Sequence, residues 1–212
     1  MSLLKDSWSA FPREIAQVYL DGFGHPSLRS KALVVSLLRE VFDSRRFRLA
    51  DFGCGNGQIC AFFREQGLAC DYVGYDFSIS LLGAARERFA SDDGARFIEA
   101  DIGDPQLAAE PCDVVLFSHV LEMLSSPERS LMAARRIAPL IMIRFFEPPV
   151  FEEDIVEVLQ MNLGADPTPA PYLRRKMSRD YYNMVLNKIG CRSVDVHQVD
   201  GDKDQVHLLR YT

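Results

Sequence analysis

Short apolar segments alternate with longer amphipathic segments through the middle of the chain. The apolar segments predict strands, and the amphipathic segments, with apolar positions at helical spacing, predict helices. The expected strands are residues 48–52, 72–76, 95–100, 113–118 and 140–145, and the helices between them include 58–66 and 78–90. Strands that alternate with helices form βαβ units, which place helices on both faces of a parallel sheet. The pattern therefore predicts an α/β fold with a doubly wound, mostly parallel sheet.

The pattern changes at both ends of the chain. Residues 1–45 are predicted to form an N-terminal helical cap, because apolar residues recur at helical spacing within 28–41. At the other end, 193–199 and 206–211 alternate between apolar and polar positions around an acidic turn that contains Gly201. Alternation on both sides of such a turn is typical of a β-hairpin. We therefore expect an antiparallel C-terminal hairpin at the end of the sheet.

Residues 146–177 interrupt the alternation of strands and helices. A helix is expected within 151–163, and the three prolines of 166–171 predict irregular structure after it. Long irregular insertions often carry substrate contacts, although a plain surface excursion is an equal alternative. We assign 46–212 to one domain, with 146–177 as an insertion on its substrate side.

A glycine-rich loop follows the first predicted strand and precedes a helix, which is the context in which such a loop indicates a ligand-binding site. Its spacing is Gly-x-Gly-x-Gly, from Gly53 to Gly57. The dinucleotide-binding fingerprint has its third glycine one position later, where this chain has Gln58. In addition, Asp51 lies two residues before the first glycine, where a carboxylate repels a diphosphate and suits an ammonium group. The loop therefore favours a zwitterionic or cationic ligand.

Three acidic residues follow successive predicted strands at equal intervals. Asp76 lies 25 positions after Asp51, and Asp101 another 25 positions on. In βαβ units of this period all three lie at the carboxyl edge of the sheet, where ligands bind. Asp76 is placed to accept hydrogen bonds from ribose hydroxyls, and Asp101 from an adenine amino group. Taken singly, each acid is more often a helix cap or a solvated loop residue; the three in register with one glycine loop favour a nucleoside site.

These segments together resemble the class I S-adenosylmethionine-dependent methyltransferases. Residues 51–57 are similar to the first motif of that family, 75–78 to the second, 100–102 to the third and 113–119 to the fourth. The resemblance covers about 47–146 and extends weakly to the C-terminal hairpin, and the chain lacks the Lys-Pro-Gly-Gly turn that often precedes the fifth strand. It implies a seven-stranded sheet whose last strand is antiparallel and inserted, with S-adenosyl-L-methionine as the cofactor. The residues expected to contact the cofactor are Asp51, Gly53, Cys54, Gly55, Asn56, Gly57, Asp76, Phe77, Ser78, Asp101, Ile102, Ser118 and His119.

Two residues are candidate general bases. His119 ends the fourth predicted strand beside the first, and its unperturbed pKa of about 6.5 suits proton removal near neutrality. Glu147 follows the fifth strand at the same edge and is a candidate to accept a proton or a hydrogen bond from a substrate amine. Glu122 lies within helical reach of His119 and is a candidate to orient it. The alternatives are a histidine that only packs against the cofactor and a solvated glutamate.

The charge balance and the cysteines narrow the class of partner. The net charge of −6 counts against nucleic acid as a partner, and no long apolar run predicts a membrane span. The five cysteines show no metal-binding spacing, so no metal site is expected. With no secretion signal at the N-terminus, an odd number of cysteines is typical of a cytoplasmic protein with reduced thiols.

We therefore expect an enzyme that transfers a methyl group to an oxygen or nitrogen of a small-molecule acceptor. The sequence does not predict its oligomeric state. The alternatives are a non-catalytic S-adenosylmethionine-binding regulatory or assembly module, a protein methyltransferase, and a nicotinamide-dependent oxidoreductase, against which the glycine spacing and Asp51 argue.

Overall fold

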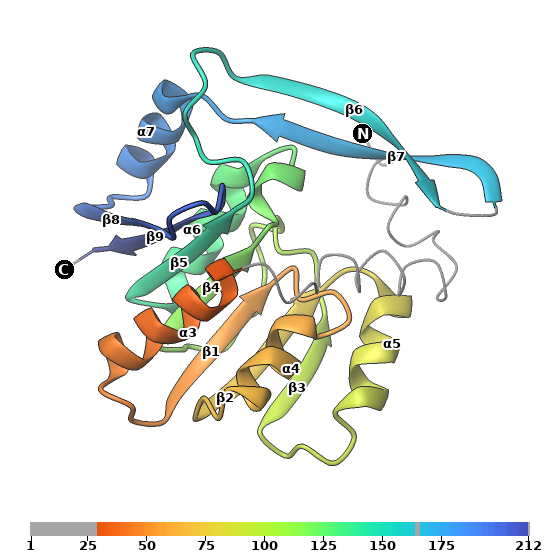
Figure 1. Ribbon diagram of the computed structural model, residues 1–212, viewed down its shortest axis with the longest axis vertical. Coiled ribbons are helices and arrows are strands. Elements are labelled where there is room, and N and C mark those ends of the chain that lie inside the picture. Colours follow the sequence, from red (N-terminus) through yellow and green to blue (C-terminus); the bar gives the residue numbers. More distant parts are fainter. Residues whose placement is uncertain (1–28, 164–165, 212) are drawn as a thin grey trace.

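A computed structural model describes residues 29–163 and 166–211 of the protein (Figure 1). The strands of the main sheet are β1 (Phe47–Phe52), β2 (Cys70–Asp76), β3 (Ala95–Glu99), β4 (Val114–Ser118), β5 (Leu140–Phe145), β8 (Ser193–Gln198) and β9 (Gln205–Arg210). The helices are α3 (Arg29–Phe42), α4 (Gln58–Glu65), α5 (Ile79–Arg88), α6 (Pro127–Ile137) and α7 (Arg179–Lys188), with a 3₁₀ turn η1 (Leu121–Met123). All the strands and helices that the sequence analysis places in this sheet and on its faces are confirmed to within two residues.

The seven strands lie in the order β3-β2-β1-β4-β5-β9-β8. Strands β1 to β5 are parallel, whereas β9 runs antiparallel to β5 and β8 antiparallel to β9. The predicted seven-stranded sheet with an antiparallel C-terminal hairpin is therefore confirmed. The order of the strands reverses between β1 and β4, and the carboxyl ends of strands at such a reversal form a crevice suited to a ligand.

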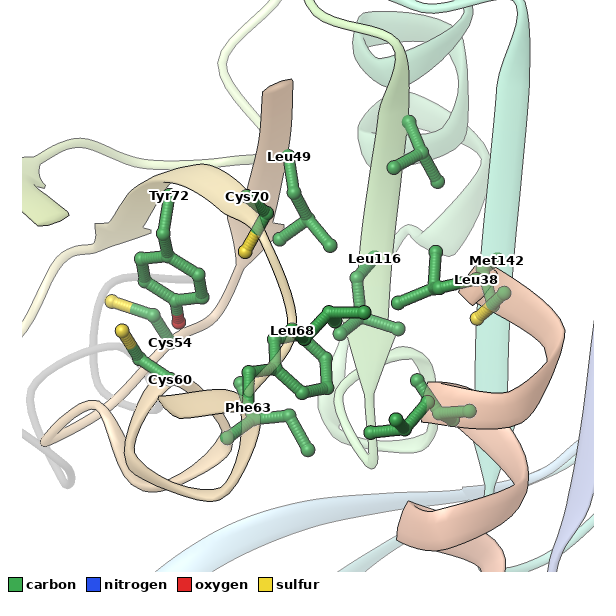
Figure 2. Packing of buried hydrophobic residues seen from close by; sticks show 14 of the residues in the cluster. Leu38, Leu49, Cys54, Cys60, Phe63, Leu68, Cys70, Tyr72, Leu116 and Met142 are labelled. Atoms are coloured by element: carbon green, nitrogen blue, oxygen red, sulfur yellow. The ribbon is translucent and has the colours of Figure 1, made fainter. Parts of the chain in front are cut away.

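Helices cover both faces of the sheet because its parallel strands are apolar on both sides. In β4, Val114 and Leu116 pack into one core cluster, while Val115 and Phe117 pack into the other. The first cluster includes residues of α3, α4 and α5, and the second includes residues of α6 and α7. Figure 2 shows part of the first cluster, with Leu116 of β4 facing Leu38 of α3. The predicted doubly wound arrangement is thereby confirmed.

The segment after β5 differs from the prediction. It forms an antiparallel hairpin of β6 (Ile155–Leu163) and β7 (Asp166–Lys176), so the helix expected within 151–163 and the irregular structure expected at 166–171 are both wrong. Ile155, Val156 and Val158 are β-branched, and such residues favour strands. Because the prolines of β7 are two positions apart, their missing N–H groups all fall on the same edge, which can be the unpaired one. In Figure 1 the hairpin extends as a long arm across the top of the molecule.

The N-terminal prediction is tested only in part. The helix expected over 28–41 corresponds to α3, in which Val34, Val35 and Leu38 are buried. Residues 1–28, and with them most of the predicted cap, lie outside the described residues. In the part of the chain that the structure describes, no helix has the length and apolar character needed to cross a membrane.

Glu122 holds η1 against the chain that leaves β5. Its side chain is fully buried, and its Oε1 atom accepts hydrogen bonds from the backbone N–H groups of Phe146 (2.8 Å) and Glu147 (3.4 Å). Among the described residues, Oε2 has no hydrogen-bond partner. Burial, with a smaller contribution from the charge of Asp204, raises the pKa of Glu122 from 4.5 to about 7. The native protein therefore binds this proton more tightly than the unfolded chain does.

Replacing Glu122 with glutamine should make stability less sensitive to pH. Because the pKa of Glu122 is raised on folding, its contribution to stability is complete below pH 4.5 and is lost as the pH rises through about 7. Glutamine keeps the accepting oxygen and does not titrate. We expect the stability of Glu122→Gln relative to the wild type to rise by about 3 kcal/mol across this range, at about 1.36 kcal/mol per pKa unit. Urea unfolding at several pH values measures it.

Glu152→Gln is the matched control, because Glu152 is an exposed carboxylate. Its stability difference from the wild type should stay level across the same range. A level difference for Glu122→Gln as well would show that the native state does not raise the pKa of Glu122.

Candidate functional site

A cavity of about 940 Å³ lies at the carboxyl ends of β1, β2 and β4, where the strand order reverses. Its size is typical of a pocket for a small molecule or cofactor. Of the residues predicted from the sequence to contact a cofactor, those lining the cavity are Asp51, Gly53, Cys54, Gly55, Asn56, Asp76, Phe77, Asp101, Ile102, Ser118 and His119. Gly57, Ser78 and Glu147 do not line it. The fold thus brings most of the predicted residues together around one space.

The glycine loop needs glycine for conformational and steric reasons. Gly53, Gly55 and Gly57 have φ angles of 83°, 53° and 77°, in the left-handed region that side chains disfavour. A Cβ atom on Gly53 would lie 2.6 Å from a methyl carbon of Val120. The loop is held against β2, because the N–H groups of Gly53 and Cys54 both donate to the carbonyl oxygen of Tyr75 (2.8 and 3.1 Å). Gly57 is the N-cap residue of α4, so its role is to turn the chain into that helix.

Cys54 occupies space that a glycine on the neighbouring strand leaves open. A Cβ atom on Gly74 would lie 2.6 Å from the Cys54 sulfur and 2.9 Å from a ring carbon of Phe97. Burial raises the pKa of the Cys54 thiol well above its usual value, so the thiol stays protonated. Cys54 therefore packs as a small, mainly apolar side chain beneath the loop.

Asp76 connects the glycine loop to the start of the next helix. Its Oδ2 atom accepts a hydrogen bond from the N–H of Gly55 (2.8 Å), and Oδ1 accepts one from the N–H of Ser78 (2.9 Å). Ser78 in turn caps α5. Burial raises the pKa of Asp76, and the backbone hydrogen bonds oppose this shift. The carboxylate thereby fixes both segments on either side of it and still lines the cavity.

Asp51 is a buried acid with one unused oxygen. Its side chain accepts a hydrogen bond from the Tyr72 hydroxyl through Oδ2, while Oδ1 has no partner among the described residues. Burial raises its pKa to about 7, and the charge of Asp76 adds to the shift. A cation bound in this part of the cavity would be stabilised by both carboxylates.

Lys31 brings a positive charge to the same cavity. It lies on α3, is 7% exposed and has its ammonium 5.9 Å from the ring centre of Phe62. Burial, followed by the nearby charge of Arg144, lowers the pKa of Lys31 to about 8. The sequence analysis missed this residue. A lysine beside the apolar face of a predicted helix was the only signal.

His119 follows β4 directly, has a left-handed conformation with φ of 59°, and lines the cavity. Its Nε2 atom lies 2.8 Å from Oδ2 of Asp204, which also accepts from the Ser30 hydroxyl (2.7 Å) and the Arg144 guanidinium (2.9 Å). Sequence reasoning missed Asp204, although the acidic turn before β9 was visible. The contact joins residues 85 positions apart and depends on β9 pairing beside β5.

The two other acids considered from the sequence engage different partners. Glu122 bonds to the backbone after β5, so the expected contact with His119 is absent and Asp204 takes that place. Glu147 forms an ion pair with Arg174 of β7, with oxygen-to-nitrogen distances of 2.5 and 3.0 Å. Glu147 does not line the cavity. No contact in the structure therefore supports its role as a base, which stays a prediction.

A family model described as "Methyltransferase domain" matches residues 50–138. The malonyl-[acyl-carrier protein] O-methyltransferase of Enterobacter lignolyticus (strain SCF1) is 37% identical over 73 residues, which are 34% of this chain and 27% of that protein. The matched segment thus spans about a quarter of the length of this curated relative.

Solved structures show the same fold. The DhpI complex with SAH has a TM-score of 0.70 at 18% identity, covering 100% of this chain and 98% of that chain. DesVI of Streptomyces venezuelae has a TM-score of 0.67 at 15% identity, with coverage of 94% and 98%. The N-terminal domain of EvdMO1 with SAH bound has a TM-score of 0.64 at 17% identity, with coverage of 86% and 81%. At such low identities these structures establish the architecture only.

The family match begins one residue before Asp51 and extends to the end of α6, so it contains the glycine loop and the three acids that line the cavity. The sheet order and the similar solved structures extend the agreement to the rest of the fold. The resemblance found in the sequence is confirmed: residues 50–138 match a methyltransferase domain, and the fold is that of solved structures with SAH bound.

Proposed function

We propose that this protein binds S-adenosyl-L-methionine in the cavity and transfers its methyl group to an oxygen or nitrogen of a small-molecule acceptor. The observation that carries the proposal is the single cavity in which the glycine loop lies beside three acids, Asp51, Asp76 and Asp101. The three acids follow one another along the sheet edge in the same order as the ammonium group, the ribose hydroxyls and the adenine ring of this cofactor.

The charges in the cavity fit the amino-acid end of the cofactor. The unpartnered Oδ1 of Asp51 suits an ammonium group, and the buried ammonium of Lys31 suits a carboxylate. A buried charge is costly unless it is paired, so a ligand that supplies both opposite charges is favoured. A diphosphate would meet the repulsion of Asp51, which disfavours a nicotinamide dinucleotide.

The nucleoside end fits the remaining residues. Asp76 is held by two backbone hydrogen bonds, and a carboxylate can accept further bonds from ribose hydroxyls. Phe77, Leu81 and Ile102 line the cavity with apolar surface that suits an adenine ring, and Asp101 adds an acceptor for its amino group. The residues present therefore fit S-adenosylmethionine along its whole length.

Apolar side chains line the part of the cavity that we assign to the acceptor. Met123 and Leu124 follow β4, and Val158 and Leu173 of the β6–β7 hairpin line the same cavity. Polar groups also line it, from Arg129 and the serines Ser125, Ser126 and Ser130. This composition favours an acceptor with a substantial apolar part, and the hairpin is the element that selects it.

When bound, S-adenosylmethionine supplies a methyl group already activated by its positively charged sulfur. The protein then has to align the acceptor, exclude water and remove a proton where the acceptor carries one; alignment alone is worth about 7–11 kcal/mol. The best-placed base is His119, whose ring lines the cavity. Burial and the charge of Arg144 lower its pKa to about 4, so the imidazole is uncharged at neutral pH with a lone pair available, but it is a weaker base than the unperturbed pKa of about 6.5 predicts.

Calorimetric titration of the full chain with S-adenosylmethionine, with its demethylated product and with NAD tests the proposal. We expect heat from the first two and none from NAD. A screen of small hydroxyl and amine acceptors for release of the demethylated product then tests turnover. Binding of both nucleosides with no product from any acceptor would favour the non-catalytic module, and binding of NAD alone would favour an oxidoreductase.

Removing the Asp76 carboxylate should weaken cofactor binding. We expect Asp76→Ala to raise the dissociation constant for S-adenosylmethionine by roughly 10- to 150-fold, which corresponds to the 1.5–3 kcal/mol typical of hydrogen bonds to a charged group. Asp71→Ala is the matched control, since Asp71 lies near the other end of β2, half-exposed and paired with Arg46. Equal dissociation constants for the two variants would remove Asp76 from the ribose role.

Removing the His119 imidazole should reduce turnover while cofactor affinity stays within a few-fold of the wild type. Asparagine is the appropriate replacement, because it tolerates the left-handed backbone found at this position. We expect His119→Asn to lower kcat by about 10²-fold or more, the usual contribution of a general base. Unchanged kcat with the acceptor found in the screen would leave packing as the function of His119.

A further inference from the structure

One buried oxygen of Asp204 accepts hydrogen bonds from three donors. Its Oδ2 atom lies 2.8 Å from His119 Nε2, 2.7 Å from the Ser30 hydroxyl and 2.9 Å from the Arg144 guanidinium, and its side chain is 1% exposed. Oδ1 has no partner among the described residues. The donors come from α3, from β5 and from the residue after β4, so three segments converge on the residue just before β9. A carboxylate with this many donors stays ionised, and its pKa is lowered to about 2.

This contact determines which nitrogen of His119 carries the proton. A carboxylate oxygen can only accept, so Nε2 must be the protonated nitrogen. In a neutral imidazole the other nitrogen, Nδ1, then holds a free lone pair. No residue in the described ranges forms a hydrogen bond to Nδ1, and the ring lines the cavity. The ring therefore offers its basic atom to a bound molecule and not to the protein.

The position of the ring is fixed from several sides. The N–H of His119 donates to the carbonyl oxygen of Arg144 (2.9 Å), and the Phe146 ring meets the imidazole edge-on at 5.3 Å. The left-handed φ of His119 is a costly conformation for a residue with a side chain, and such conformations persist where the surroundings fix them. Asp204 supplies the one hydrogen bond that sets the ring's tautomer.

We propose that Asp204 is a positioning residue that holds His119 as its Nε2–H tautomer, so that Nδ1 is the proton-accepting atom toward the methyl acceptor. The inference rests on the proposed function for its role in catalysis. The proton leaves the oxygen or nitrogen of the acceptor and is bound by Nδ1, while the Nε2 proton stays on the ring, hydrogen-bonded to Asp204. The acceptor heteroatom keeps the electron pair of the broken bond to hydrogen for the new bond to carbon. This arrangement serves acceptors that carry a removable proton, namely hydroxyls and protonated amines.

Several charged groups surround the imidazole and act on its protonation. Arg144 and Lys31 oppose a positive charge on it, and Asp204 favours one. Glu122 lies close enough to Asp204 for their charges to interact. In the same way, Asp202 lies close enough to Arg144 for their charges to interact. Of these groups only Asp204 touches the ring. Its removal should therefore disfavour the imidazolium that proton transfer creates.

Nitrogen-15 NMR of histidine-labelled full-length protein at neutral pH tests the tautomer without any acceptor. The chain has four histidines, and His119→Asn assigns the resonance. We expect the wild type to show His119 protonated at Nε2 and Asp204→Ala to shift it toward a mixture of the two tautomers, because the oxygen that accepts from Nε2 is lost. Asp195→Ala makes the same change at an exposed residue of the same hairpin, paired with Arg210, and should leave the spectrum unchanged. If His119 of the wild-type protein is protonated at Nδ1, the proposal is overturned. This measurement uses the wild type alone, so it does not depend on whether a variant folds.

Turnover provides the second measurement, with the first acceptor that gives product in the screen above. We expect Asp204→Ala to lower kcat by about 10²-fold, with KM and the affinity for S-adenosylmethionine within a few-fold, and Asp195→Ala to match the wild type. A changed tautomer with unchanged kcat overturns the catalytic role of Asp204. Absence of S-adenosylmethionine binding overturns the proposed function instead, because the tautomer is measured independently of it.

Discussion

The hydrogen bond between the Gly55 amide and the Asp76 carboxylate links the glycine loop to the second strand of the sheet. The same carboxylate holds Ser78 at the start of α5, so one buried acid sets the geometry of two loops at the switch point of the strand order. Burial opposes ionisation of Asp76, and the backbone donors offset that cost. The cavity keeps its shape because this acid is satisfied by the protein before any ligand is present.

The other buried charges differ in how the protein holds them. Asp204, Arg144 and Ser30 are hydrogen-bonded to one another and join α3, β5 and the turn before β9. In contrast, Oδ1 of Asp51 has no partner among the described residues, and Lys31 brings a positive charge to the same cavity. Unsatisfied charge in a cavity costs stability in the free protein and is recovered on binding. We interpret the first group as a rigid frame and the second as the part that recognises a ligand.

The sequence predicted what depends on local pattern and missed what depends on contacts between distant residues. Alternating strands and helices, the glycine spacing and the interval between the acids were enough to place Asp51, Asp76 and Asp101 on one edge. Prolines in β7 concealed the hairpin, because their compatibility with an edge strand depends on which side is paired. Asp204 could not be assigned to His119, since their contact exists only through the pairing of β5 with β9.

The close fit of Cys54 against Gly74 has a consequence for how the loop can evolve or be redesigned. Any side chain at position 74 would overlap the sulfur of Cys54, so the two positions are not independent. A library of variants that changes only the glycine loop leaves Gly74 of β2 unchanged. At position 54 it can therefore yield only side chains that fill the same space as cysteine. Larger changes at position 54 require a compensating change on the adjacent strand, and sequences of natural homologues should show the two positions varying as a pair.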